Sequence, residues 1–163
     1  MNGFVTKTVE FDAGHRLPNH KSKCRNVHGH RYKVEVTFVD RILDQPGESQ
    51  DGMVVDFGDL TDLLNSVVYG PFDHGFIAWD QDQQLISFLS DDLGVKVITM
   101  PFPPTAENMA RIIAWRLGIA LQESSCEVLK VDVWETPTSR ATVLWNDVRE
   151  DYAQTAAEAA RDN

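Results

Sequence analysis

The chain has 163 residues, of which 42% are hydrophobic, and a formal net charge of −10. This length and composition are typical of one soluble globular domain. The apolar runs are too short to span a membrane, and the first residues lack the basic region and hydrophobic core of a secretion signal, so we expect a cytoplasmic protein. The acidic balance argues against binding to nucleic acid, which depends on cationic contacts to phosphate.

Two strands are predicted at the start of the chain, because hydrophobic residues alternate with polar ones over residues 4–15 and 28–38. Side chains two apart along a strand point to the same face. His15 extends the apolar side of the first strand, and His28 and His30 begin the apolar side of the second. If the strands pair as a hairpin, the three imidazoles meet on the buried face at its loop end.

The rest of the chain is expected to contain helices followed by two more strands. Helices are predicted over residues 56–69, 83–93 and 106–123, an extended stretch over 95–100, and strands over 127–135 and 140–145. Asp56 and Thr105 are the expected N-caps, and Gly70-Pro71 is the expected end of the first helix. This order predicts an α+β fold with a single domain over residues 1–147. Residues 148–163 are expected to be a short polar tail, which either forms a short helix or is frayed.

The loop of the hairpin adds a thiol to the histidines, in the run Cys24-Arg25-Asn26-Val27-His28-Gly29-His30. Imidazole and thiolate ligands suit zinc, and three histidines leave a fourth position for water, substrate or a sulfur. Any one of these histidines alone is better explained as a hydrogen-bonded residue of the core or its rim. Together they predict a metal site. With no secretion signal, Cys24 and Cys126 are expected to be free thiols.

The same region is basic within an acidic protein. Residues 13–34 contain no Asp or Glu but hold six of the fifteen Lys and Arg residues. A cationic patch beside a metal site suggests a small anionic substrate such as a phosphate ester. The alternative on charge alone is a solvated basic loop without a ligand.

Glu135 lies at a predicted buried position, where a carboxylate requires a bonding partner. It ends the predicted apolar side of the strand that contains Leu129, Val131 and Val133, and an unpaired buried carboxylate is costly. One explanation is a ligand with a guanidine-like edge, to which a carboxylate can bind through two parallel N–H bonds. The other is an exposed strand end or an internal pair with an arginine.

Three further polar residues are weaker candidates. Asp73 and His74 form an adjacent acid–imidazole pair that could transfer protons, although surface turns often contain the same two residue types. Glu107 lies in the first turn of its predicted helix, where the helix dipole alone explains an acidic residue.

Several motifs together resemble the family of 6-pyruvoyl-tetrahydropterin and 6-carboxy-tetrahydropterin synthases. They are Phe11-Asp12-Ala13-Gly14-His15, the run from Cys24 to His30, Gly52-Met53-Val54-Val55-Asp56-Phe57, Asp73-His74, Pro104-Thr105-Ala106-Glu107-Asn108 and Trp134-Glu135-Thr136. The short gap between Cys24 and His28 is similar to that of the 6-carboxy branch, since the gap in the pyruvoyl branch is longer. The segment Gly75-Phe76-Ile77 departs from the lysine, asparagine and leucine pattern that follows the Asp-His pair in the family.

The resemblance implies a role for each matching residue. Zn²⁺ would be bound by His15, His28 and His30, Cys24 would be the catalytic thiol, Asp73 and His74 would form its partner acid/base dyad, and Glu135 would anchor the pterin ring. The remaining candidates for substrate binding are Thr105, Glu107, Lys23 and Arg25.

The resemblance also implies a fold, an assembly and a reaction. The fold is the tunnelling fold, a four-stranded antiparallel sheet with helices between its second and third strands. Family members form homotrimers, usually stacked into hexamers, with active sites between subunits. The reaction converts 7,8-dihydroneopterin triphosphate to 6-carboxy-5,6,7,8-tetrahydropterin, acetaldehyde and triphosphate, in queuosine or other 7-deazaguanine biosynthesis.

Two alternatives remain open from the sequence. In one, an enzyme of the same fold stops after triphosphate elimination and makes the 6-pyruvoyl product. In the other, Cys24 closes a zinc site of one cysteine and three histidines, and the protein is a non-catalytic structural or binding module.

Overall fold

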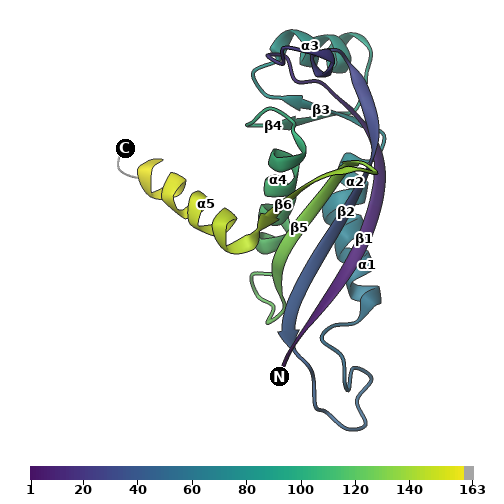
Figure 1. Cartoon of the computed structure of the whole chain (residues 1–163), viewed down its shortest axis with the longest axis vertical. Coiled ribbons are helices and arrows are strands. Elements are labelled where there is room, and N and C mark those ends of the chain that lie inside the picture. The colour runs from purple at the N-terminus through teal and green to yellow at the C-terminus, as the bar shows by residue number, and fades with distance from the viewer. Residues whose placement is uncertain (160–163) are drawn as a thin grey trace.

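The fold is α+β, with one mixed sheet of six strands in the order β4-β3-β1-β2-β5-β6 (Figure 1). The structure is a computed structural model that describes residues 1–159, with the helix backbone alone for residues 154–159. The strands are β1 Asn2–His15, β2 His28–Arg41, β3 Gly75–Trp79, β4 Val97–Met100, β5 Glu127–Thr136 and β6 Ser139–Leu144. The helical segments are η1 Lys23–Arg25, α1 Phe57–Leu64, η2 Asn65–Tyr69, α2 Gly70–Phe72, α3 Gln83–Ser87, η3 Phe88–Asp92, α4 Ala106–Ala120 and α5 Trp145–Ala159.

The predicted hairpin is confirmed. Strands β1 and β2 pair in antiparallel fashion over their whole length, with His15 opposite His28 and Ala13 opposite His30. The loop between them therefore returns the chain so that all three histidines lie on one face at one end of the pair.

The predicted helix caps are also confirmed. The Asp56 side chain accepts a hydrogen bond from the Gly58 N–H, and the Thr105 side chain accepts one from the Asn108 N–H. The prediction that Gly70-Pro71 ends the first helix is wrong, because α1, η2 and α2 follow one another without a break up to Phe72. Pro71 lies in the first turn of α2, where a missing N–H is tolerated.

The expected four-stranded antiparallel sheet is corrected to six strands. The additional strands β3 and β4 pair parallel to each other, and β3 also pairs parallel to β1. An extended stretch over 95–100 was predicted and is β4, but β3 was missed. Four of its five residues are buried, so it lacks the alternation of polar and apolar residues that marks a half-exposed strand.

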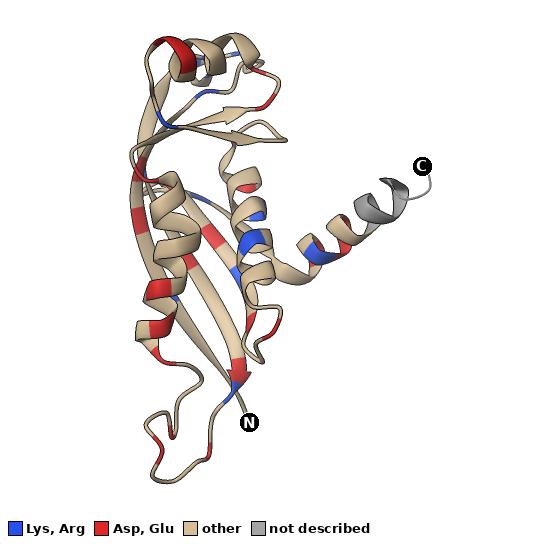
Figure 2. Ribbon diagram, turned by 180° about the vertical axis from the view of Figure 1, so that it is seen from behind, with Lys and Arg blue, Asp and Glu red and all other residues tan. Residues whose placement is uncertain are grey.

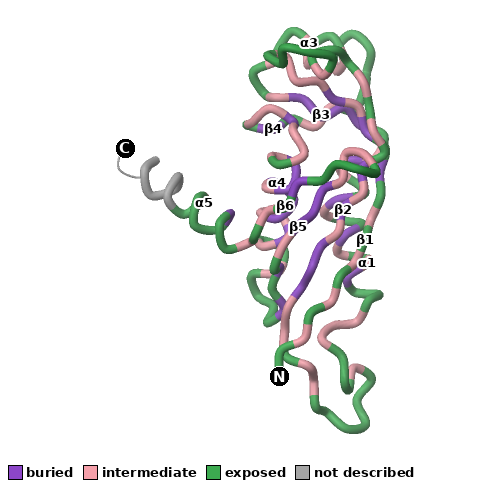
Figure 3. Tube along the Cα trace, viewed as in Figure 1, coloured by how far each residue is buried: buried purple, intermediate pink, exposed green. Residues whose placement is uncertain are grey.

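The hydrophobic core lies between one face of the sheet and the helices α1, α2 and α4 (Figure 3). A bulge in β5 corrects the predicted apolar side of that strand. Phe38 pairs with Val128 while Thr37 pairs with Lys130, so Leu129 is the extra residue of β5. As a result Val128 is buried at 2% exposure, and Leu129 is 38% exposed.

The predicted tail begins as a helix, α5, that projects from the body of the protein (Figure 1). Its base is fixed by the ring of Tyr152, which stacks on Trp115 with centroids 3.9 Å apart. The expected domain boundary after residue 147 falls within the first turn of this helix, and residues 160–163 lie outside the described part of the chain. None of the described helices is long and apolar enough to cross a membrane.

Candidate metal and substrate site

Three imidazoles converge at the end of the hydrophobic core. The metal-ligating nitrogen atoms of His15, His28 and His30 all lie within 4.8 Å of one another. The ring of Tyr32 lies beneath them, edge-on to His15 and His30 at centroid distances of 5.9 and 5.6 Å. Strand pairing alone produces this convergence, since His28 faces His15 across the hairpin and His30 follows two residues later on the same face.

Backbone carbonyls orient two of the three rings. His15 Nδ1 donates to the Pro104 carbonyl oxygen at 2.8 Å, and His28 Nδ1 donates to the Asn26 carbonyl oxygen at 2.7 Å. A carbonyl oxygen only accepts, so each Nδ1 carries the hydrogen and each Nε2 keeps a lone pair. Sequence reasoning missed Pro104, because a backbone acceptor has no residue-type signature. The only available signal was its place in the motif that begins α4.

The free nitrogen atoms suit a metal ion. His15 Nε2 and His28 Nε2 lie 3.1 Å apart. His30 Nε2 is buried and has no hydrogen-bond partner among the described residues. Three nitrogen lone pairs facing one point repel one another unless a cation lies between them, and a ring held through Nδ1 by a carbonyl is the usual arrangement of a metal-binding histidine. The residues present therefore fit a metal such as zinc.

Burial favours the neutral form of two of the rings, those of His15 and His30. It lowers the pKa of His15, although the hydrogen bond to the Pro104 carbonyl acts in the opposite direction. Burial also lowers the pKa of His30. Only the neutral imidazole binds a metal, so His15 and His30 keep their metal-binding form to lower pH than exposed histidines would.

Glu135 lies beside the histidines. One of its carboxylate oxygens, Oε1, is 3.6 Å from His15 Nε2 and 3.9 Å from His30 Nε2. Its side chain is 29% exposed, so the carboxylate can also reach a ligand. The described contacts of Glu135 are with these imidazoles and do not include the internal arginine considered above.

Cys24 faces the same region from the loop. It is half-buried in η1, and its carbonyl oxygen accepts a hydrogen bond from the Leu17 N–H at 2.8 Å. A cavity of about 430 Å³ opens here, lined by Lys23, Cys24, Asn26, His28, His30, Glu135 and Thr136. One cavity is thus lined by the thiol, two of the imidazoles, the carboxylate and Lys23, one of the two basic candidates for substrate binding. Arg25 is exposed and is not among the lining residues.

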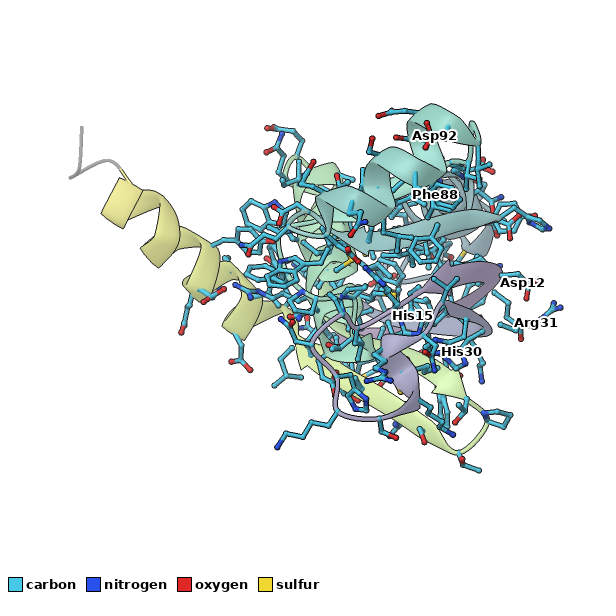
Figure 4. The ribbon with its side chains drawn as sticks, turned by 90° about the horizontal axis from the view of Figure 1, so that it is seen from above. Asp12, His15, His30, Arg31, Phe88 and Asp92 are labelled. Carbon is cyan, nitrogen blue, oxygen red and sulfur yellow. The ribbon has the colours of Figure 1, made fainter. Side chains whose placement is uncertain are left out.

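Asp73 and His74 lie apart from Cys24 in a single chain. His74 lines a separate, open hollow of about 550 Å³, which it shares with His30, Asp12 and Arg31. Figure 4 shows Asp12 and Arg31 pointing outward, away from His15 and His30. The His74 side chain is 80% exposed, and its Nδ1 lies 2.7 Å from Asp73 Oδ2. The dyad is formed, but within one chain it does not share a cavity with the thiol.

Thr105 and Glu107 are explained by the helix that they begin. The Thr105 side chain caps α4, and Glu107 is exposed in its first turn. Neither residue lines the cavity that contains Cys24 or the hollow that contains His74.

Acidic residues lie at both ends of the molecule. Figure 2 shows Asp and Glu positions along α1 and the loop before it, and others on the helical segment at the top of the view. The basic residues Lys21, Lys23 and Arg25 belong to the loop of the hairpin. This basic loop allows an anion at the histidine end of an acidic protein.

The chain is similar in sequence to known proteins of one family. The family model described as 6-pyruvoyl tetrahydropterin synthase matches residues 4–145. A 6-carboxy-5,6,7,8-tetrahydropterin synthase from Haemophilus influenzae is 37% identical over 138 residues, which cover 83% of this chain and 94% of that protein. A protein of the same name from Rickettsia bellii is 38% identical over 133 residues, covering 81% and 93% of the two chains.

Solved structures share the fold. An uncharacterized protein from Wolinella succinogenes superimposes with a TM-score of 0.72 at 25% identity, covering 88% of this chain and 98% of that one. The 6-pyruvoyl tetrahydropterin synthase of Caenorhabditis elegans has a TM-score of 0.62 at 23% identity, covering 88% and 96%. The tunnelling fold that the motifs predict is confirmed by these likenesses.

Proposed function

Because the chain belongs to the 6-pyruvoyl tetrahydropterin synthase family, we propose that it is a zinc-dependent cytoplasmic lyase of the 6-carboxy branch. Its substrate is 7,8-dihydroneopterin triphosphate, which reacts with a water molecule. The products are 6-carboxy-5,6,7,8-tetrahydropterin, acetaldehyde and triphosphate, and the pterin product enters queuosine or other 7-deazaguanine biosynthesis. The observation that carries the proposal is the convergence of three imidazoles, two of which line one cavity together with Cys24 and Glu135.

His15, His28 and His30 would hold the metal. Zinc bound there would supply Lewis acidity, which would polarise the oxygens of the substrate side chain and acidify the neighbouring C–H. Pro104 and Asn26 keep the rings of His15 and His28 in the tautomer that the metal requires.

The substrate is oriented by charge at both of its ends. The Glu135 carboxylate accepts two N–H bonds from the guanidine-like edge of the pterin ring, and this pairing fixes the ring in the cavity. The triphosphate lies toward the basic loop, where Lys23 lines the cavity and Arg25 is exposed nearby in sequence. Thr105 and Glu107 contribute by forming the start of α4, which carries the Pro104 carbonyl to His15.

Protons are moved by two groups. Cys24 as thiolate takes the proton from the acidified carbon. Asp73 and His74 of a neighbouring copy relay the second proton, since in one chain they lie outside the Cys24 cavity. A homotrimer or a hexamer of stacked trimers brings the exposed His74 of one copy to the cavity of the next. Elimination of triphosphate and cleavage of a carbon–carbon bond then complete the reaction.

Incubation of zinc-loaded protein with 7,8-dihydroneopterin triphosphate tests the proposal, with mass analysis of the pterin and an assay for acetaldehyde. We expect 6-carboxy-5,6,7,8-tetrahydropterin together with acetaldehyde. Formation of 6-pyruvoyl-tetrahydropterin without acetaldehyde would assign the chain to the sister branch. An absence of turnover in zinc-loaded, folded protein would overturn the proposed activity and favour a non-catalytic zinc module.

A further inference from the structure

His74 holds an unusual backbone conformation where α2 meets β3. Its φ is +54°, and among the described residues it is the one residue other than glycine with a positive φ. This left-handed conformation is unfavourable for any residue other than glycine, so the surrounding structure must hold it. Burial of the ring does not do so, because the His74 side chain is 80% exposed.

The Asp73 carboxylate is the centre of the bonds that hold His74. It accepts from the Asp12 N–H at 3.2 Å and from His74 Nδ1 at 2.7 Å, and the Tyr69 hydroxyl interacts with it as well. The bond from His74, then those from Asp12 and Tyr69, lowers the pKa of Asp73 and keeps it ionised. Since Nδ1 donates to this carboxylate, Nε2 carries the lone pair in the neutral form of the ring, whose side chain is 80% exposed.

Lys96 closes the other side of the same turn. Its ammonium group donates to the carbonyl oxygens of Gly70 at 2.8 Å and Asp73 at 2.9 Å, the last carbonyls of the helical run. Its own carbonyl oxygen accepts from the Phe76 N–H at 2.8 Å. Lys96 thus contacts the chain on both sides of His74. Lys96 directly precedes β4, so the turn is held by a residue distant from it in the chain.

We propose that Lys96 and Tyr69 are positioning residues for His74. Lys96 holds the backbone of the turn, and Tyr69 holds the carboxylate, so that the His74 ring keeps its hydrogen on Nδ1 and presents Nε2 for proton transfer. The inference rests on the proposed function, in which His74 moves a proton at the site of a neighbouring copy.

A long-range proton–nitrogen NMR spectrum of the ¹⁵N-labelled imidazoles tests the proposal without substrate, with His74→Ala used to assign the signals. In the unmodified protein we expect the Nδ1–H form of His74 to predominate. Lys96→Met removes the donors but keeps the aliphatic stem, and Tyr69→Phe removes one oxygen. Both should shift the His74 nitrogen signals toward a mixture of the two tautomers. Lys96→Arg, which keeps the charge and the donors, should restore the original pattern, and Lys7→Met on the distant part of β1 should not change it.

Kinetics then connect the position of the ring with proton transfer. In Lys96→Met we expect kcat to fall about tenfold while KM changes little, because a displaced catalytic group lowers the rate without weakening substrate binding. Unchanged His74 signals in both Lys96→Met and Tyr69→Phe would overturn the proposal. If Lys96→Met fails to fold, Tyr69→Phe decides by the same criterion. A protein that lacks synthase turnover but shows the expected NMR shifts would contradict the proposed function and leave the positioning role intact.

Discussion

The Nε2 atoms of His15 and His28 lie 3.1 Å apart, while the Nδ1 atom of each ring is engaged by a backbone carbonyl. In two neutral rings with these tautomers, two lone pairs face each other across that distance. The contact is unfavourable until a cation lies between them, so part of the free energy of metal binding compensates for this repulsion. Since one carbonyl belongs to Pro104 at the start of α4, the metal site also connects the hairpin to that helix.

The first prediction concerns the metal. Zinc should stabilise the folded protein, and a free concentration of about 100 times Kd should add about 2.7 kcal/mol to the free energy of unfolding. Metal content and melting temperature with and without a chelator measure this effect. His15→Ala and His28→Ala should lose both the zinc and the stabilisation. His20→Ala is the matched control, because His20 is an exposed residue of the loop that connects His15 to His28. Equal zinc content in all three variants would contradict the assignment.

The second prediction concerns the stability of the metal-free protein at different pH. The folded-state pKa values of His15 and His30 are lowered from the ordinary value of 6.5. The unfolded chain therefore binds more protons than the folded chain once the pH falls below about 6.5. The stability that the two neutral histidines contribute is fully present above about pH 6.5, and it decreases as the pH falls toward their folded-state pKa values. Urea midpoints of chelator-treated protein at several pH values should show this decrease. His15→Gln should reduce it, and His20→Ala should not.

The hairpin and its histidines could be predicted because the signal is local. A strand has a period of two, and His15, His28 and His30 all fall on the apolar side of their strands, so pairing alone brings them together. The helix caps Asp56 and Thr105 were predictable for the same reason, since a cap is a property of a few consecutive residues.

The features that could not be predicted from the sequence depend on contacts between residues that are distant in the chain. Strand β3 is buried on both faces, so Gly75–Trp79 shows no alternation. The bulge at Leu129 reverses the face of that residue and depends on the register with β2. The bond from His15 to Pro104 joins residues 89 positions apart. None of these three features can be recognised from the local pattern of residue types.

The third prediction separates catalysis from structure at Cys24. Cys24→Ala should keep its zinc and its melting temperature, because three histidines form the site without it. Turnover should fall by a factor of about 100 or more, as expected when a group that transfers a proton is removed. Zinc content, thermal unfolding and product formation measured on one preparation distinguish the two roles. Loss of zinc together with stability would instead show that Cys24 is a structural ligand. Cys126, buried outside this cavity, provides the thiol control through Cys126→Ala.

The fourth prediction concerns Glu135. Its carboxylate is partly exposed at the mouth of the cavity and lies 3.6 Å from His15 Nε2, so a ring bound to it lies next to the metal. Glu135→Gln keeps the shape of the side chain but replaces one acceptor with a donor, which leaves one N–H of the ring edge without a partner. The loss of a hydrogen bond to a charged group corresponds to about a tenfold or greater increase in KM. Zinc content should be unchanged, since the three imidazoles are intact. Glu127→Gln, an exposed change at the other end of β5, should leave KM as it was. An unaltered KM in Glu135→Gln would show that the carboxylate does not bind the pterin, and that its place beside His15 and His30 reflects the metal site alone.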